Sequence, residues 1–250
     1  MSTRSSRSFL HGIHPDDHKG ATEALPIERM PLGTHFVMLL GQHIGAPSKC
    51  LVEVGQRVMR GQAIAESVGF VSVGMHSPVT GTVTGIRPRR HPNGSLVTGV
   101  EIEADPYDSQ RLHASPAVDP AGLDRAAFVG HVQSGGLVGL GGAAFPSHVK
   151  YAVKEGARVD KLALNGAECE PYLTSDHRTM VERTADVVRG IDIVGTALGV
   201  SQADIGVELN KKDAIQALEA AVAQRGDGPF PIHIRPMEVK YPQGAEKMLI

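Results

Sequence analysis

A glycine-rich segment at residues 135–150, GGLVGLGGAAFPSHVK, has the strongest chemical pattern in the sequence. Five glycines fall within eight residues, and the stretch that follows them could begin a helix. Because glycine has no Cβ, its backbone N–H groups can approach an anion, and the positive end of a helix dipole adds to the attraction. We therefore predict a phosphate-binding loop with Lys150 as the counter-charge. The spacing matches neither the Walker loop nor the GxGxxG fingerprint, so a flexible surface loop is the alternative.

A second polar segment, LNGAECEPYLTSDHR at residues 164–178, directly follows a short apolar run that predicts a strand. Asn165 could hydrogen-bond a planar heterocycle or ribityl hydroxyls, and Glu168 and Glu170 could accept hydrogen bonds from a nucleotide. Proteins of the α/β class bind ligands at the carboxyl ends of their strands, which favours a binding role. Taken singly, each of these side chains is more often a solvated loop residue.

A third segment, YPQGAEKMLI at residues 241–250, again follows a predicted strand. Tyr241 could stack on a ring, Gly244 would allow a close backbone approach, and Glu246 could accept a hydrogen bond. The three segments must be brought together by the elements around them, and those elements fall into two halves of different character.

Residues 34–104 have the pattern of an all-β domain. Short apolar alternations are interrupted by Gly, Pro and Asn, as in a sheet with many turns. Strands are predicted at 35–40, 50–54, 63–67, 82–86 and 97–102. Residues 51–66 and 76–86 resemble the paired hairpins of lipoyl-like barrel-sandwich domains. The segment between them, 66–76, has no lysine to carry lipoate or biotin, so a scaffold or docking role is favoured over a carrier role.

The second half predicts an α/β layer. Residues 105–120 contain three prolines and no periodicity, as is typical of a linker. Beyond it, we expect strands at 161–164 and 205–209, a strand opening with Ile232 and Ile234, and amphipathic helices at 176–198 and 212–224. Alternating strands and helices indicate a largely parallel sheet. The predicted division is an N-terminal segment 1–33, a β domain 34–104, a linker 105–120 and an α/β domain 121–250.

Taken together, the three segments resemble the flavin-binding subunit of respiratory complex I, with its GRGGAGFPTG loop, NADE.EP loop and Y.CGEE.AL turn. The resemblance to the C subunit of the Rnf complex is closer still and covers residues 9–250. It is carried by the segments FLHGIHPDDHK, QHIGAP, GLGGAAFPSHVK, NGAECEPYLTSDHRTM and YPQGAEKMLI. The resemblance implies an FMN site and a site for the nicotinamide nucleotide NAD(H). The FMN residues would be Gly139, Gly141, Gly142, Lys150, Asn165, Glu168 and Gly244, and those facing NADH would be Phe145, Glu170, Tyr241 and Glu246.

This sequence departs from the complex I pattern at three positions. Leu140 replaces an arginine, Ala167 an aspartate and Ala245 a glutamate, which weakens any claim that the two sites bind nucleotide equally. Leu140 and Ala167 nonetheless resemble the sequence pattern of the Rnf C subunit.

The Rnf resemblance implies membership of an ion-translocating ferredoxin:NAD oxidoreductase complex. Hydride would pass between NAD(H) and FMN, and electrons would continue to ferredoxin through two 4Fe–4S clusters. The cysteine motifs for those clusters are absent from this chain, so we expect a fragment that ends before the cluster domain. The other Rnf subunits would be its partners, at the cytoplasmic face of the inner membrane. The alternatives are a non-catalytic docking scaffold and a relative of the A subunit of the sodium-pumping NADH:quinone reductase.

Composition excludes several other classes of protein. The chain has 25 Lys+Arg against 27 Asp+Glu and a formal charge of −2, so it lacks the excess of basic residues that is typical of proteins that bind nucleic acid. Only two cysteines occur, far apart, which excludes a disulfide framework. No apolar stretch is long enough to span a membrane. His11, His14 and His18 have a spacing that metal ligands can have, but a polar N-terminal segment is the favoured interpretation.

Overall fold

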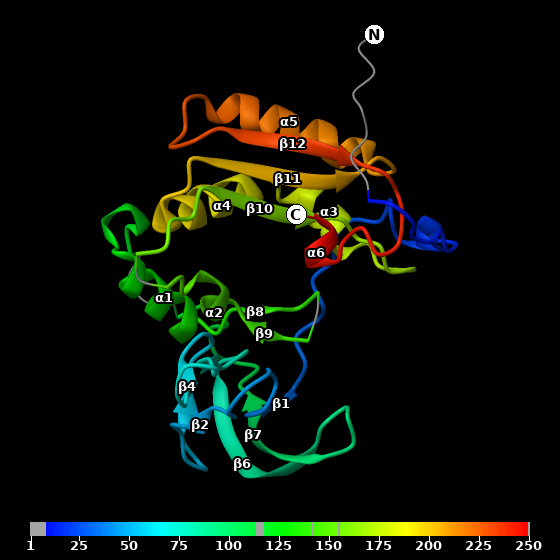
Figure 1. Ribbon diagram of the computed structural model, residues 1–250. Helices are drawn as coiled ribbons and strands as arrows, with labels where there is room; N and C mark the ends of the chain where they lie inside the picture. Colours follow the sequence, from blue (N-terminus) through cyan, green and yellow to red (C-terminus); the bar gives the residue numbers. More distant parts are fainter. Residues whose placement is uncertain (1–8, 114–117, 142, 155, 250) are drawn as a thin grey trace. The chain divides into compact units, whose positions relative to one another are not determined.

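The computed structural model describes residues 9–113, 118–141, 143–154 and 156–249 (Figure 1). Contacts within the chain divide it into two compact units. One unit is formed by residues 30–155, and the other joins residues 156–250 to the N-terminal residues up to 29. We call the first the barrel unit and the second the sheet unit.

The barrel unit is built on two small antiparallel sheets, as the pattern of residues 34–104 predicts. One has the strand order β1-β7-β6-β3 and the other β2-β4-β5. The strands are β1 (His35–Leu39), β2 (Lys49–Cys50), β3 (Arg57–Val58), β4 (Ala63–Glu66), β5 (Met75–His76), β6 (Gly81–Arg90) and β7 (Leu96–Ala104). Small branched side chains form its core, and five of them, Val58, Ile64, Val79, Val83 and Val100, are wholly buried.

Four of the five predicted strands of this unit are confirmed, and the fifth is mostly wrong. Of residues 50–54, only Cys50 belongs to a strand, and the two-residue strands β3 and β5 were not predicted. Arg87, Arg89 and Arg90 lie within β6. Arg87 and Arg89 both donate to Glu101 on β7, and these hydrogen bonds lower the pKa of Glu101 to about 2.

The remainder of the barrel unit carries the glycine-rich segment. Its elements are a 3₁₀ turn η2 (Pro120–Gly122), α1 (Arg125–Ser134), β8 (Val138–Gly139), β9 (Phe145–Pro146) and α2 (Ser147–Tyr151). Within the predicted linker, the Gln110 amide donates to the carbonyls of Thr80 and Asp105, so this stretch lies on the β domain. Residues 114–117 lie outside the described residues. By their contacts, residues 121–155 belong to the barrel unit, whereas the sequence pattern assigned them to the α/β domain. The predicted domain boundaries remain a prediction.

The sheet unit has the parallel sheet that the alternating pattern predicts, in the order β10-β11-β12. Its strands are β10 (Lys161–Gly166), β11 (Gln202–Glu208) and β12 (Ile232–Met237). The helices are α3 (Ser175–Glu182), α4 (Thr184–Leu198), α5 (Lys212–Arg225) and α6 (Glu246–Leu249), with a 3₁₀ turn η1 (Lys19–Ala21) near the N-terminus. Ala203, Ile205 and Val207 of the central strand are wholly buried, as are Ala214 and Leu218 of α5.

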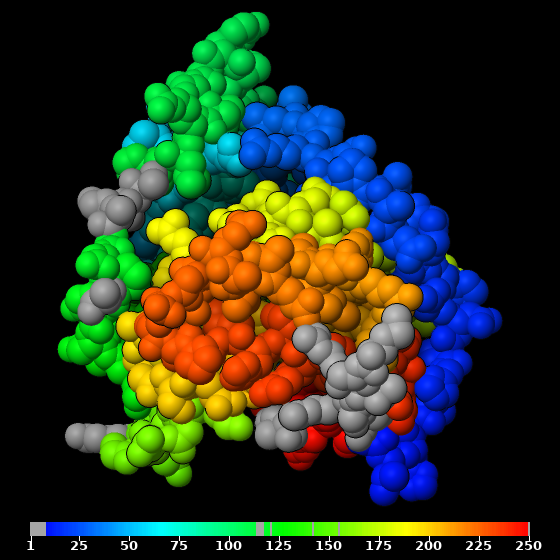
Figure 2. All heavy atoms as spheres, turned by 90° about the horizontal axis from the view of Figure 1, so that it is seen from above, coloured from blue at the N-terminus to red at the C-terminus, as the bar shows by residue number. Residues whose placement is uncertain are grey.

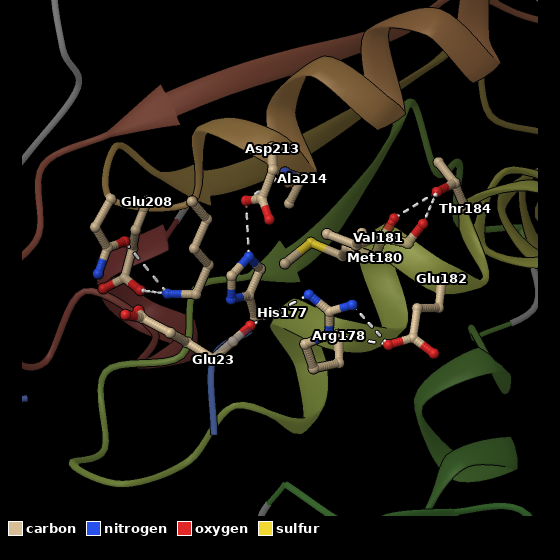
Figure 3. A network of polar contacts seen from close by, with 12 residues as sticks. Glu23, His177, Arg178, Met180, Val181, Glu182, Thr184, Glu208, Asp213 and Ala214 are labelled. Atoms are coloured by element: carbon tan, nitrogen blue, oxygen red, sulfur yellow. Dashed lines mark hydrogen bonds and ion pairs between the residues drawn. The ribbon is translucent and has the colours of Figure 1, made fainter. Parts of the chain in front are cut away.

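The single helix predicted over 176–198 is wrong, because the chain forms two helices there. Arg183 leaves helical geometry between them, with φ −125° and ψ 32°. The Thr184 hydroxyl donates to the carbonyls of Met180 and Val181, and so satisfies acceptors at the end of α3 (Figure 3). Side chain to backbone bonds of this kind compete with continuation of a helix.

Candidate functional site

The glycine-rich segment forms a β-hairpin followed by a short helix. Gly139 pairs with Phe145 across the hairpin, and Leu140, Gly141 and Ala143 lie in the turn between them. Gly141 lies on this turn, where an added Cβ would meet nothing within 4 Å, and the Leu140 side chain is 86% exposed. Lys150 is exposed on α2. Gly142 lies outside the described residues.

The hairpin is held to the β domain through the loop at 69–72. The Gln133 amide donates to the carbonyl oxygens of Gly69, Phe70 and Ser72, at 3.0, 3.3 and 3.0 Å. His148, wholly buried, places its Nε2 2.6 Å from the Phe70 carbonyl oxygen. Residues 66–76 are the stretch in which a carrier domain would need its lysine, and here their backbone anchors the glycine hairpin instead.

In the sheet unit, Asn165 and Gly244 come together from segments 79 residues apart. Asn165 lies near the end of β10, and its amide Nδ2 donates to the Gly244 carbonyl at 2.8 Å, while its Oδ1 accepts from the Ala167 N–H. The Gly244 N–H donates to Cys169 Sγ at 2.9 Å. A Cβ on Gly244 would lie 3.2 Å from both the Ala167 oxygen and that sulfur, so glycine suits the close approach. The second and third polar segments therefore form one edge of the sheet.

Glu168 is buried in the same loop, with only 2% of its surface exposed. Its Oε1 accepts from the Asp176 N–H at the start of α3, at 2.8 Å. Its Oε2 lies 3.7 Å from Lys19 Nζ and accepts no hydrogen bond within the described part of the chain. A carboxylate oxygen kept from water in this way has capacity for a donor.

A second buried carboxylate, Glu208, follows at the end of β11. Glu208, labelled in Figure 3, pairs with Lys211, and the side chains of both residues are almost wholly buried. The Glu168 N–H donates to Glu208 Oε2 at 3.1 Å, which ties the loop after β10 to the end of β11. Sequence reasoning missed Glu208 and Lys211, although a carboxylate at the end of an apolar strand was available as a signal.

The residues predicted to face NADH are divided between the two units. Glu170, Tyr241 and Glu246 are at least partly exposed in the sheet unit, while Phe145 belongs to the barrel unit. Tyr172 is 68% exposed and stacks on His18, with 4.9 Å between ring centroids.

Two further side chains of this region, Cys169 and His14, could have other chemical roles. Burial raises the pKa of the Cys169 thiol, and the nearby Glu208 and Glu170 carboxylates raise it further, so the unreactive thiol form is favoured. His14 Nδ1 lies 3.0 Å from the Val239 carbonyl oxygen. Among the described residues, no group of three or more His, Cys, Asp or Glu is placed to hold a metal ion, and no helix is long and apolar enough to cross a membrane.

Comparison with known proteins matches both halves of the chain. Residues 7–107 match the family described as the RnfC barrel sandwich hybrid domain, and residues 132–250 match the Nuo51 FMN-binding domain. Together these matches confirm the predicted combination of a barrel-sandwich domain with an α/β domain like that of the complex I flavin protein.

Curated relatives match nearly the whole chain. It is 40% identical, over 247 residues and 97% of its length, to the C subunit of the Na⁺-translocating ferredoxin:NAD(+) oxidoreductase complex of Acetobacterium woodii, and covers 54% of that protein. It is 40% identical to the C subunit of the proton-translocating complex of Clostridium ljungdahlii, covering 98% of this chain and 52% of the relative. The C subunit of the ion-translocating oxidoreductase complex of Pseudomonas aeruginosa is 38% identical, with 97% and 31% covered. The chain thus spans about half the length of the first two relatives.

Proposed function

We propose, from the premise that this chain belongs to the RnfC family of ion-translocating oxidoreductase complexes, that it binds FMN and presents it to a nicotinamide nucleotide. The observation that carries the proposal is the joining of Asn165 to Gly244 at the carboxyl edge of the parallel sheet, where α/β proteins bind ligands. Both residues lie within the stretch that matches an FMN-binding domain.

Two features of the described residues fit a flavin mononucleotide. The backbone around Gly141 is open, because a Cβ there would contact nothing, and open backbone N–H groups suit a phosphate. In the sheet unit, the exposed Asn165 amide suits the hydroxyl and ring N–H groups of a flavin, and the loop that follows it is fixed by the buried Glu168, whose Oε1 accepts from the Asp176 N–H.

The role of the chain's own residues would be to bind and orient the FMN and the nicotinamide nucleotide. From their positions in the stretch that matches an FMN-binding domain, we assign Gly139, Gly141, Gly142 and Lys150 to the FMN phosphate and ribityl chain. Asn165, Glu168 and Gly244 are assigned to the flavin by the same match.

The nicotinamide nucleotide is assigned to Phe145, Glu170, Tyr241 and Glu246. When bound, FMN supplies the chemistry of hydride exchange with NAD(H), and the protein contributes alignment and electrostatics. We assign no side chain of this chain the role of an acid.

For the whole protein we propose the activity that two relatives carry in their names, ferredoxin:NAD(+) oxidoreduction coupled to ion transport. Ferredoxin would exchange electrons through 4Fe–4S clusters whose cysteine motifs this chain lacks. Other members of the complex would be its partners, with the chain peripheral to the membrane on its cytoplasmic face.

The test is flavin retention by the full chain. Purified protein is mixed with FMN, freed of unbound flavin by gel filtration and examined for the visible absorbance of flavin. Riboflavin, which has no phosphate, is the matched comparison. We expect FMN to be retained at one per chain and riboflavin to be lost. Protein that stays colourless with FMN would contradict the proposal and support the docking scaffold instead.

A further inference from the structure

Residues 9–27 run along the loops at the carboxyl edge of the sheet, and we call them the N-terminal strap. Ile13 and Tyr241 exchange two backbone hydrogen bonds, of 3.0 and 2.8 Å. The Tyr172 N–H donates to the Asp17 carbonyl at 2.8 Å. In Figure 2 the strap, in the darkest blue, lies beside the red segment that ends the chain. The strap therefore touches both polar loops of the sheet unit.

Lys19 is the buried residue of this strap, with 4% of its surface exposed. Its ammonium donates to the backbone carbonyl of Glu170 at 2.9 Å and to that of Leu173. Glu168 Oε2 lies 3.7 Å away and supplies the opposite charge. All three acceptors belong to one loop, residues 168–173, which comes from a region about 150 residues further along the chain.

The burial of this lysine calls for a specific arrangement around it. Lysine is almost never fully buried unless it is paired, because removing an ammonium from water is costly. Here the cost is offset by two carbonyls and a carboxylate that the 168–173 loop presents only in its observed conformation. Lys19 and the loop conformation therefore require each other.

The same loop is fixed at its other side by β11. The Glu168 N–H donates to Glu208 Oε2, and Glu208 is in turn paired with the buried Lys211. Glu168 thus has its backbone held by one buried ion pair and its side chain held by Lys19. Glu168 Oε2, the atom nearest Lys19, is itself buried and accepts no hydrogen bond within the described residues.

From these contacts we infer that Lys19 is a positioning residue for the flavin and nucleotide site. It acts through the 168–173 loop, holding Glu168 and Glu170 in the geometry that binds ligand. This inference rests on the proposed function, since it names a residue outside the FMN-binding stretch as part of the same site.

The experiment replaces the ammonium by an uncharged side chain of similar length, Lys19→Met, in the full chain. Lys161→Met, at an exposed lysine of the same unit, is the matched control. Two quantities are measured at a temperature where circular dichroism shows both variants folded. They are the dissociation constant of FMN, from the quenching of flavin fluorescence, and the hydrogen exchange of residues 166–176 without ligand.

For Lys19→Met we expect the FMN dissociation constant to rise about tenfold or more, as for the loss of a bond to a charged group. The amides of Tyr172 and Asp176 should exchange about tenfold faster, because their acceptors belong to the strap and to Glu168. The control should match wild type in both measurements. A folded Lys19→Met protein with wild-type affinity and wild-type exchange would overturn the inference and leave the proposed function intact.

A second variant separates positioning from simple charge compensation. Lys19→Met combined with Glu168→Gln removes both buried charges, so the protein should regain thermal stability, while the Tyr172 amide still exchanges faster than in wild type because the Glu170 and Leu173 carbonyls still lack their donor. Wild-type exchange at Tyr172 in this double variant would overturn the inference. If the wild-type chain itself binds no FMN, the proposed function fails, and the exchange data alone decide whether Lys19 orders the loop.

Discussion

The buried ion pair at the end of β11 gives a sharp prediction about the stability of the sheet unit. Lys211 and Glu208 are 2% and 1% exposed, and Glu208 Oε2 accepts from both the Lys211 ammonium and the Glu168 N–H. Replacing Lys211 by methionine would leave a carboxylate buried with a single neutral donor on that oxygen. The pair matters for the proposed site because it fixes the loop that carries Glu168.

Removing one member of a buried pair typically costs about 3–5 kcal/mol, because the remaining charge is uncompensated. At about 4 °C of unfolding temperature per kcal/mol for a unit of this size, Lys211→Met should unfold roughly 10–20 °C lower than wild type. Combining it with Glu208→Gln removes the stranded charge, and the introduced amide keeps an oxygen that can accept from the Glu168 N–H. That double variant should recover most of the loss.

Thermal unfolding followed by circular dichroism measures both effects. Lys212→Met, at the exposed neighbouring lysine, is the control and should unfold close to wild type. The reasoning is refuted if Lys211→Met unfolds at the wild-type temperature, or if the double variant is no more stable than the single one.

Two further predictions concern the barrel unit. Gly141→Val should leave stability within about 0.5 kcal/mol of wild type, because a Cβ there meets nothing, yet weaken FMN binding roughly tenfold to a hundredfold by blocking backbone donors. Fluorescence titration checks this beside Gly122→Val, another open position, and equal affinities for the two variants would contradict it. Hydrogen bonds from Arg87 and Arg89 hold the pKa of Glu101 near 2, below the ordinary 4.5. The ionised Glu101 carboxylate therefore stabilises the folded protein above pH 4.5, and this stabilisation is lost as the pH falls toward 2. Glu101→Gln should therefore lose less stability over that range in acid denaturation, and a pH dependence as steep as that of wild type would rule this out.

The two kinds of sheet were predictable because local periodicity and turn residues dominate in both. The apolar alternation before Glu208 and the face formed by Leu218 and its neighbours correspond closely to β11 and α5. The break at Arg183 was not predictable from spacing, because the apolar face continues through it. It depends on the Thr184 hydroxyl, whose bonds to the preceding turn are visible only in the fold.

The residues of the candidate site likewise include some that the sequence predicted and some that it did not. Asn165 and Gly244 were identified from their positions after strands, and they do meet, because parallel strands end at one edge of a sheet. Lys19 gave no comparable signal. A lysine in a polar N-terminal segment is ordinarily solvated, and its burial depends on carbonyls contributed by a loop about 150 residues away.

The most direct test of the central claim is anaerobic addition of NADH to the FMN-loaded full chain, followed by visible absorbance. Bound flavin that accepts hydride loses its visible absorbance. We predict prompt bleaching in the wild-type chain, and restoration of the colour when an oxidant is added. If FMN stays bound to the protein and its spectrum does not change with NADH, the claim that this chain joins flavin to nicotinamide is contradicted.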